Sequence, residues 1–155
     1  MKRCNPAGAD WHYVLDQTKF VLLNNLLNFY PAARPVAPWP ISRIASPGMA
    51  ERNQLLNEAL AEHRLGLEQQ AGLLAKKLQP LADGSYSLTL TAAERETLIQ
   101  VLNDLRMGSW CTLGQPEKLE PPSGPATEEE LTARAIMEVT GYFEYCLIAA
   151  DLGHA

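Results

Sequence analysis

The chain has 155 residues, of which 46% are hydrophobic and 20% charged, and its formal net charge is −5. This length and composition are typical of a single globular domain with its own hydrophobic core. Its 13 Lys and Arg residues are outnumbered by 18 Asp and Glu residues. Nucleic acids and anionic membranes attract basic proteins, so we expect neither nucleic acid nor a membrane as a partner.

Cysteine content and the N-terminal residues indicate a cytoplasmic location. Cys4, Cys111 and Cys146 lie far apart and form no Cys-x-x-Cys pair, which argues against a zinc site, a redox motif or a disulfide framework. Residues 1–10 lack the apolar run of a signal peptide. The most apolar window, 20–29, contains three asparagines and is too short to cross a bilayer.

The first elements are a strand and a helix. Trp11, Tyr13 and Leu15 occupy alternate positions, which predicts a short strand with one buried face. Asp16 is placed to cap a helix that ends before Pro31. Its apolar stripe comprises Phe20, Leu23, Leu26, Leu27 and Tyr30.

A proline-rich connector at about 31–48 leads into a long helix. We interpret the connector as an extended loop pinned to the core by Trp39, with a recognition segment as the alternative. Ser46 and Pro47 predict the start of a helix that ends near Leu78 and is roughly 48 Å long. Its seam alternates steps of four and three residues: Leu56, Leu60, His63, Leu67, Ala71, Leu74 and Leu78. We expect such a helix either to cross the whole fold or to pair with another chain, and the second alternative would make a homodimer possible.

The second half begins again with a strand and a capped helix. Tyr86, Leu88 and Leu90 alternate as a strand, and Thr91 with Glu94 forms a capping box. A second connector at about 115–126 precedes another capping box at 127–130. The final helix has the apolar stripe Leu131, Ala135, Val139, Tyr142, Phe143, Cys146, Leu147 and Ala150.

The two strand–helix segments resemble each other at a shift of about 75 residues. Residues 11–16 then align with 86–91, and Leu23 and Leu27 align with Leu98 and Leu102. Both copies predict a strand, an N-cap and a helix, and the two strands could pair as a small sheet. The alternative is a chance similarity between two amphipathic segments.

We find no catalytic motif, no metal-ligand cluster and no cofactor loop in the sequence. His12, His63 and His154 lie in no zinc-peptidase or di-iron pattern. Cys111 follows Ser109 and Trp110 with no histidine nearby, so we interpret it as a small buried residue. The chain contains neither a P-loop nor a Gly-x-Gly-x-x-Gly motif.

One unusual polar cluster, at 102–106, remains a candidate site. Asn103 and Arg106 share a helix face, and Asp104 faces elsewhere and could pair with a charge on another segment. We favour a polar network that fixes helix packing. The alternative is a small-ligand or enzyme site formed by Asn103, Asp104, Arg106 and Trp110.

The same segment carries a resemblance to a known family. The patterns Leu90-Thr91-x-x-Glu94, 101–106 (Val-Leu-Asn-Asp-Leu-Arg) and Leu113-Gly114 resemble a bacterial domain family of unknown function with a Leu-Asn-Asp-x-Arg helix. That family's gene often neighbours that of the adaptor of the Clp protease. The resemblance implies a strand–helix opening, a mid-chain helix and a closing helix, and it implies no catalytic residue.

We therefore expect a mainly helical domain of about four helices, one of them long, with a possible two-stranded sheet. Its predicted core is Leu23, Leu27, Leu60, Leu67, Leu98, Leu102, Leu105, Val139 and Phe143. The expected function is a non-enzymatic interaction or regulatory module with a protein partner and no cofactor. A ligand or enzyme site near Trp110 is the alternative. Nucleic-acid binding would require a basic face built from scattered residues such as Arg43, Arg52 and Arg64.

Overall fold

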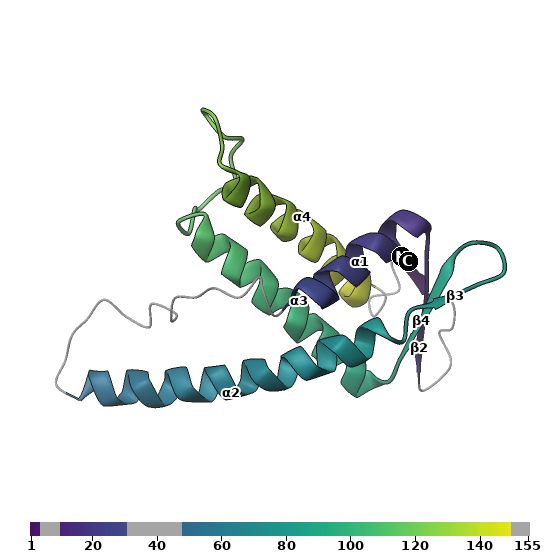
Figure 1. The fold of residues 1–155 in the computed structure, drawn as a ribbon, viewed down its shortest axis with the longest axis horizontal. Coiled ribbons are helices and arrows are strands. Elements are labelled where there is room, and N and C mark those ends of the chain that lie inside the picture. The colour runs from purple at the N-terminus through teal and green to yellow at the C-terminus, as the bar shows by residue number, and fades with distance from the viewer. Residues whose placement is uncertain (4–9, 31–47, 150–155) are drawn as a thin grey trace.

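The computed structural model describes residues 1–3, 10–30 and 48–149, and within them the chain is mainly helical with a small sheet (Figure 1). This confirms the predicted fold class. The elements, in chain order, are β1 (Lys2–Arg3), β2 (Trp11–Leu15), α1 (Gln17–Phe29), α2 (Met49–Ala75), β3 (Gln79–Pro80), β4 (Tyr86–Leu90), α3 (Ala92–Thr112) and α4 (Glu128–Ala149).

The predicted strand pair forms the centre of the sheet. The strand order is β1-β2-β4-β3, and every neighbouring pair is antiparallel. Tyr13 lies opposite Leu88, and both side chains are buried because alternate residues of each strand face the helices. The two outer strands, each of two residues, were not predicted, because two residues are too few to show a period.

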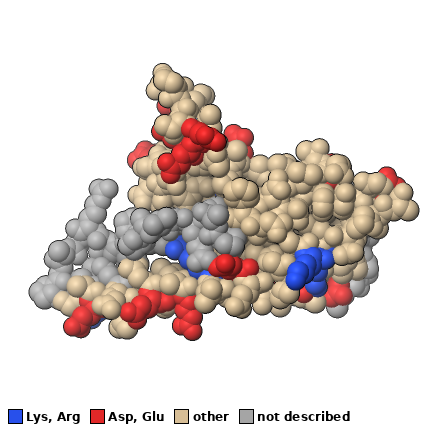
Figure 2. Space-filling view, viewed as in Figure 1, with Lys and Arg blue, Asp and Glu red and all other residues tan. Residues whose placement is uncertain are grey.

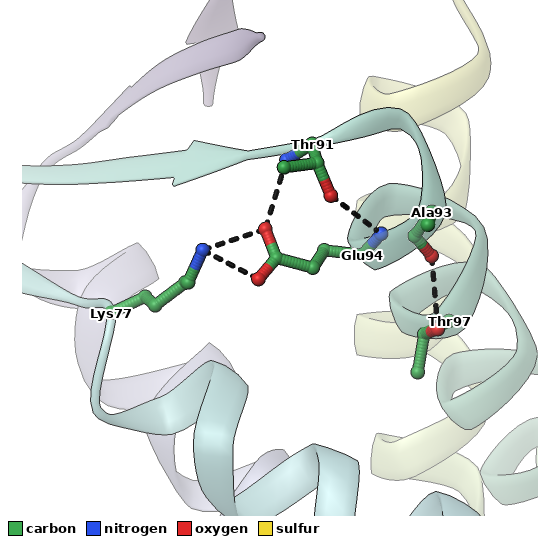
Figure 3. Close-up of polar contacts among 5 residues, drawn as sticks. All are labelled: Lys77, Thr91, Ala93, Glu94 and Thr97. Carbon is green, nitrogen blue, oxygen red and sulfur yellow. Dashed lines mark hydrogen bonds and ion pairs between the residues drawn. The ribbon is translucent and has the colours of Figure 1, made fainter.

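Two of the predicted helix caps, at Asp16 and at Thr91, are present before α1 and α3. The Asp16 side chain accepts a hydrogen bond from the Lys19 amide, and Thr91 and Glu94 form a complete capping box (Figure 3). The Lys77 ammonium lies 2.6 Å from the Glu94 carboxylate and thereby ties the end of α2 to the start of α3. The hydrogen bond from Lys77 is the largest cause that lowers the pKa of Glu94.

The chain repeats one unit of two strands and two helices: β1-β2-α1-α2, then β3-β4-α3-α4. At a shift of 75 positions, the buried residues of the first strand–helix segment fall on buried residues of the second. The pairs are Tyr13/Leu88, Leu15/Leu90, Leu23/Leu98, Leu26/Val101, Leu27/Leu102 and Tyr30/Leu105. Since Tyr13 and Leu88 also pair with each other, an approximate twofold axis passes through this pair.

The outer elements follow the same repeat. Lys2 pairs with Val14, and a shift of 75 positions places these two residues at positions 77 and 89. The observed pairing of Gln79 with Ser87 lies in the same antiparallel register, two residues further along each strand. A shift of 76 positions aligns Leu67 of α2 with Phe143 of α4, and it aligns Ala71 with Leu147. All four of these residues are buried. The repeat therefore includes the hairpins and the second helix of each half.

Most of the predicted core is buried, with two exceptions. Leu23, Leu27, Leu67, Leu98, Leu102, Leu105 and Phe143 are buried, whereas Leu60 and Val139 are half-buried. Leu60 lies on the first half of α2, which extends away from the other helices (Figure 1). Val139 lines an open groove between two helices.

The long helix differs from its prediction in its bounds. It begins at Met49 and ends at Ala75. The residue before it, Gly48, has the left-handed backbone conformation (φ 85°). The seam residues from Leu67 onwards pack within the chain's own core, whereas Leu56 is 43% exposed. The predicted first connector, including Trp39, Ser46 and Pro47, lies outside the described residues. Of the helices that are described, none is both long and apolar enough to cross a membrane.

Replacing Leu102 by Ala should lower the free energy of unfolding by about 2–5 kcal/mol, because the side chain is completely buried. Urea denaturation at neutral pH measures this loss. The control is Leu73→Ala on α2, where the side chain is 53% exposed and the change should stay within about 0.5 kcal/mol. Equal losses in the two variants would contradict the assigned core.

Replacing Glu94 by Gln should destabilise the protein near neutral pH and leave it nearly unchanged in acid. Because the pKa of Glu94 is lowered on folding, the unfolded chain binds a proton more readily. The carboxylate therefore stabilises the fold above its ordinary pKa, and this contribution is lost as the pH falls through the lowered value. Unfolding measured between about pH 7 and pH 3 should show the two proteins converging, and a constant difference would contradict this assignment.

Candidate functional site

The predicted polar cluster on α3 forms contacts with several different elements. Asp104 accepts hydrogen bonds from the Tyr30 hydroxyl (2.9 Å) and from Nε of Arg64 (3.2 Å). The side chains of Arg64 and Asp104 are 12% and 15% exposed, and Tyr30 is buried. Asp104 thus joins α3 to the end of α1 and to the middle of α2.

The other three residues of the cluster face away from this ion pair or into solvent. Nη1 of Arg106 donates to Glu144 on α4 (2.9 Å), and Nε1 of Trp110 donates to the Pro116 carbonyl (3.0 Å). Asn103 is exposed. The polar groups of Asp104, Arg106 and Trp110 are therefore engaged in contacts between elements, which is the arrangement expected of a packing network.

Other residues with reactive side chains are dispersed. Nδ1 of His12 lies 2.9 Å from the Thr89 hydroxyl across the central strand pair, and His63 is exposed on α2. Cys111 and Cys146 are half-buried and free, while Cys4 and His154 lie outside the described residues. Within the described ranges, no three His, Cys, Asp or Glu residues gather as metal ligands would.

A groove between α1 and α4 is the site that sequence reasoning missed. Its volume is about 260 Å³, and Leu105 of α3 contributes to its lining. The residues that line it from the two helices are Leu22, Asn25, Leu26 and Phe29 of α1, and Thr132, Ala135, Ile136 and Val139 of α4. Each set has the spacing i, i+3, i+4, i+7, so each helix presents one continuous face over two turns.

The groove has an equivalent on the other half of the molecule, whose lining mixes polar side chains with Ala59 and Leu67. In the repeat, Leu22 is equivalent to Thr97, and Val139 is equivalent to His63. Thr97 and His63 line a second groove along α2. Phe29 is equivalent to Asp104, which is paired with Arg64. Phe29 is 62% exposed, whereas the Asp104 side chain at the equivalent position is 15% exposed and held in an ion pair.

Acidic side chains lie at one end of the open groove. Glu128 and Glu129 are exposed and precede Thr132 by four and three residues, so they extend the groove-facing side of α4 by one turn. The Glu130 carboxylate accepts from the Thr127 amide and completes the predicted capping box. Figure 2 shows acidic residues at the end of the molecule where α4 begins.

Comparisons with models of known protein families, with curated proteins and with solved structures find no match to this chain. The candidate site therefore rests on its geometry, and the resemblance of the Leu-Asn-Asp-Leu-Arg segment to a bacterial family stays a prediction.

Replacing Asp104 by Ala should lower the free energy of unfolding by about 2–4 kcal/mol, because it leaves the Arg64 guanidinium without its ion-pair partner. Chemical denaturation measures this effect. Asn103→Ala, at the neighbouring exposed position, is the matched control and should change the free energy by no more than about 0.5 kcal/mol. A folded Asp104→Ala protein of unchanged stability would show that the network does not fix the helix packing.

Proposed function

We propose that the protein is a non-enzymatic interaction module of the cytoplasm that binds a helix of a partner protein in the groove between α1 and α4. The observation that carries the proposal is the matched pair of apolar faces, each with the spacing i, i+3, i+4, i+7. A third helix laid between two such faces can bury its own apolar stripe. This is the helix-in-groove mode of peptide recognition.

The dimensions of the groove suit a short helical segment. Seven residues of helix span about 10 Å, which is two turns, so each wall offers anchoring positions over two turns. Leu22 and Phe29 are 36% and 62% exposed, so apolar surface remains for a partner to cover. Burial of this surface would be the main driving force for binding.

A small-molecule or enzymatic site in this groove is supported less well. Ligand pockets usually occupy about 300–1,000 Å³, and the groove has about 260 Å³. Its polar lining side chains are Asn25 and Thr132, neither of which titrates near neutral pH. The alternative site around Asp104 and Arg106 would have to use groups already engaged in ion pairs.

Homodimerisation through α2 is a separate proposal and receives less support. Leu67, Leu74 and other residues of the predicted seam are part of the chain's own core. Self-association would therefore have to use a different face of α2, or only its first half, where Leu55 and Leu56 are exposed.

The test uses a synthetic helical peptide of about five turns, with Leu at i, i+3, i+4 and i+7 and Gln elsewhere, and a peptide of the same composition with the leucines scattered. We expect the striped peptide to bind with a micromolar Kd and to shift amide NMR signals of α1 and α4. Ala135→Glu should weaken binding by at least about tenfold, because the bound helix would desolvate the new carboxylate.

The matched control is Leu55→Glu, which places the same charge on an exposed position of α2 away from the groove and should leave the Kd unchanged. Circular dichroism checks that both variants are folded. The proposal is wrong if the striped and scattered peptides bind equally weakly, or if the two substitutions weaken binding to the same degree.

A further inference from the structure

We infer that the helix bound by the groove is basic at one end, and that this end lies against Glu128 and Glu129. The inference rests on the proposed function and specifies the partner: an amphipathic helix of another protein, with an apolar stripe and Lys or Arg residues confined to one terminal turn. The positions of the two glutamates along the groove carry the argument.

Glu128 and Glu129 continue the wall of the groove. Thr132 is the first lining residue of α4, and the two glutamates lie on the same side of the helix one turn earlier. Both are exposed, whereas the neighbouring Glu130 is engaged by Thr127. A helix longer than two turns would therefore extend past Thr132 and come to lie beside two carboxylates.

The opposite end of the groove has a different character. The Tyr142 hydroxyl accepts a hydrogen bond from the N-terminal ammonium group of Met1 at 2.8 Å, and burial, with the charge of Asp16 among the smaller causes, raises the pKa of Tyr142. The start of α1 therefore lies near the last turns of α4, and Asp16 at this end is paired with Lys19. Because the two carboxylates extend only the Thr132 end of the α4 wall, we expect a charged helix to bind in one orientation.

The charge also disfavours a second copy as the occupant. Among the described helices, the first half of α2 projects from the others and could reach into a neighbour's groove (Figure 1). Its exposed acids, Glu51, Glu58 and Glu62, outnumber Arg52 (Figure 2). A second copy would therefore bring negative charge to an acidic groove end, whereas a basic helix brings complementary charge.

The experiment compares three versions of the striped helical peptide: one with two Lys in its first turn, one with two Glu there and one with neutral residues. We expect the Lys peptide to bind about three- to tenfold more tightly than the neutral one, as two exposed ion pairs at a helix start would produce. The Glu peptide should bind more weakly than the neutral one. Both differences should shrink between about 0.05 M and 0.5 M salt.

The double variant Glu128→Gln, Glu129→Gln should abolish the advantage of the Lys peptide without changing the Kd of the neutral peptide. Glu58→Gln, Glu62→Gln removes the same charge from α2 and should preserve that advantage. Sedimentation of the protein alone is measured beside these titrations.

The outcomes separate the two proposals. If all three peptides bind equally, the inference about charge is wrong and the helix-binding function stands. If none binds, the proposed function itself is wrong. If the protein sediments as a dimer that Ala135→Glu dissociates, a second copy occupies the groove and the inference of a basic partner is wrong.

Discussion

The pairing of β2 with β4 is the constraint on which the rest of the structure depends. It brings together segments about 75 residues apart in sequence and places Tyr13 opposite Leu88, its own equivalent in the repeat. Because Asp16 and Thr91 cap the helices directly after these strands, the pairing also fixes where α1 and α3 begin. The buried faces of both helices then meet on one side of the sheet and form a single core. A sheet of this size needs such a helical layer, since small sheets have little stability alone.

The position of α4 explains why its groove with α1 stays open. α4 is held mainly by α3: Arg106 pairs with Glu144, and Arg95 donates to the Leu147 carbonyl at 2.7 Å. Arg95 also lies over the Trp11 ring, 4.0 Å from its centroid, and so joins β2 to the same junction. With α4 anchored in this way, its contact with α1 is much smaller than its contact with α3. Leu22 and Phe29 therefore keep apolar surface that a partner can cover.

The two halves of the repeat have diverged at equivalent surfaces. Where the first half has Phe29, the second has Asp104, which is bound by Arg64 and Tyr30. An aspartate at this depth requires a counter-charge, and the resulting ion pair links α2 to α3. The exposed phenylalanine has no such requirement, and it leaves the α1–α4 surface apolar. The ion pair of Asp104 is thus one difference between the two equivalent interfaces.

The sequence by itself determined the local structure of this protein. Period-two and helical patterns, the caps at Asp16, Thr91 and Thr127, and the alignment of Leu23 and Leu27 with Leu98 and Leu102 predicted the longer strands, the helices and much of the core. These features depend on residues close together in the chain. Only the tertiary structure decided which apolar residues are covered: it buried Leu67 within the chain, left Val139 half-buried in a groove and paired Asp104 with Arg64. Hydrophobicity marks a residue as able to be buried, but whether it is buried depends on the distance and angle between helices, which residues far apart in the sequence set together.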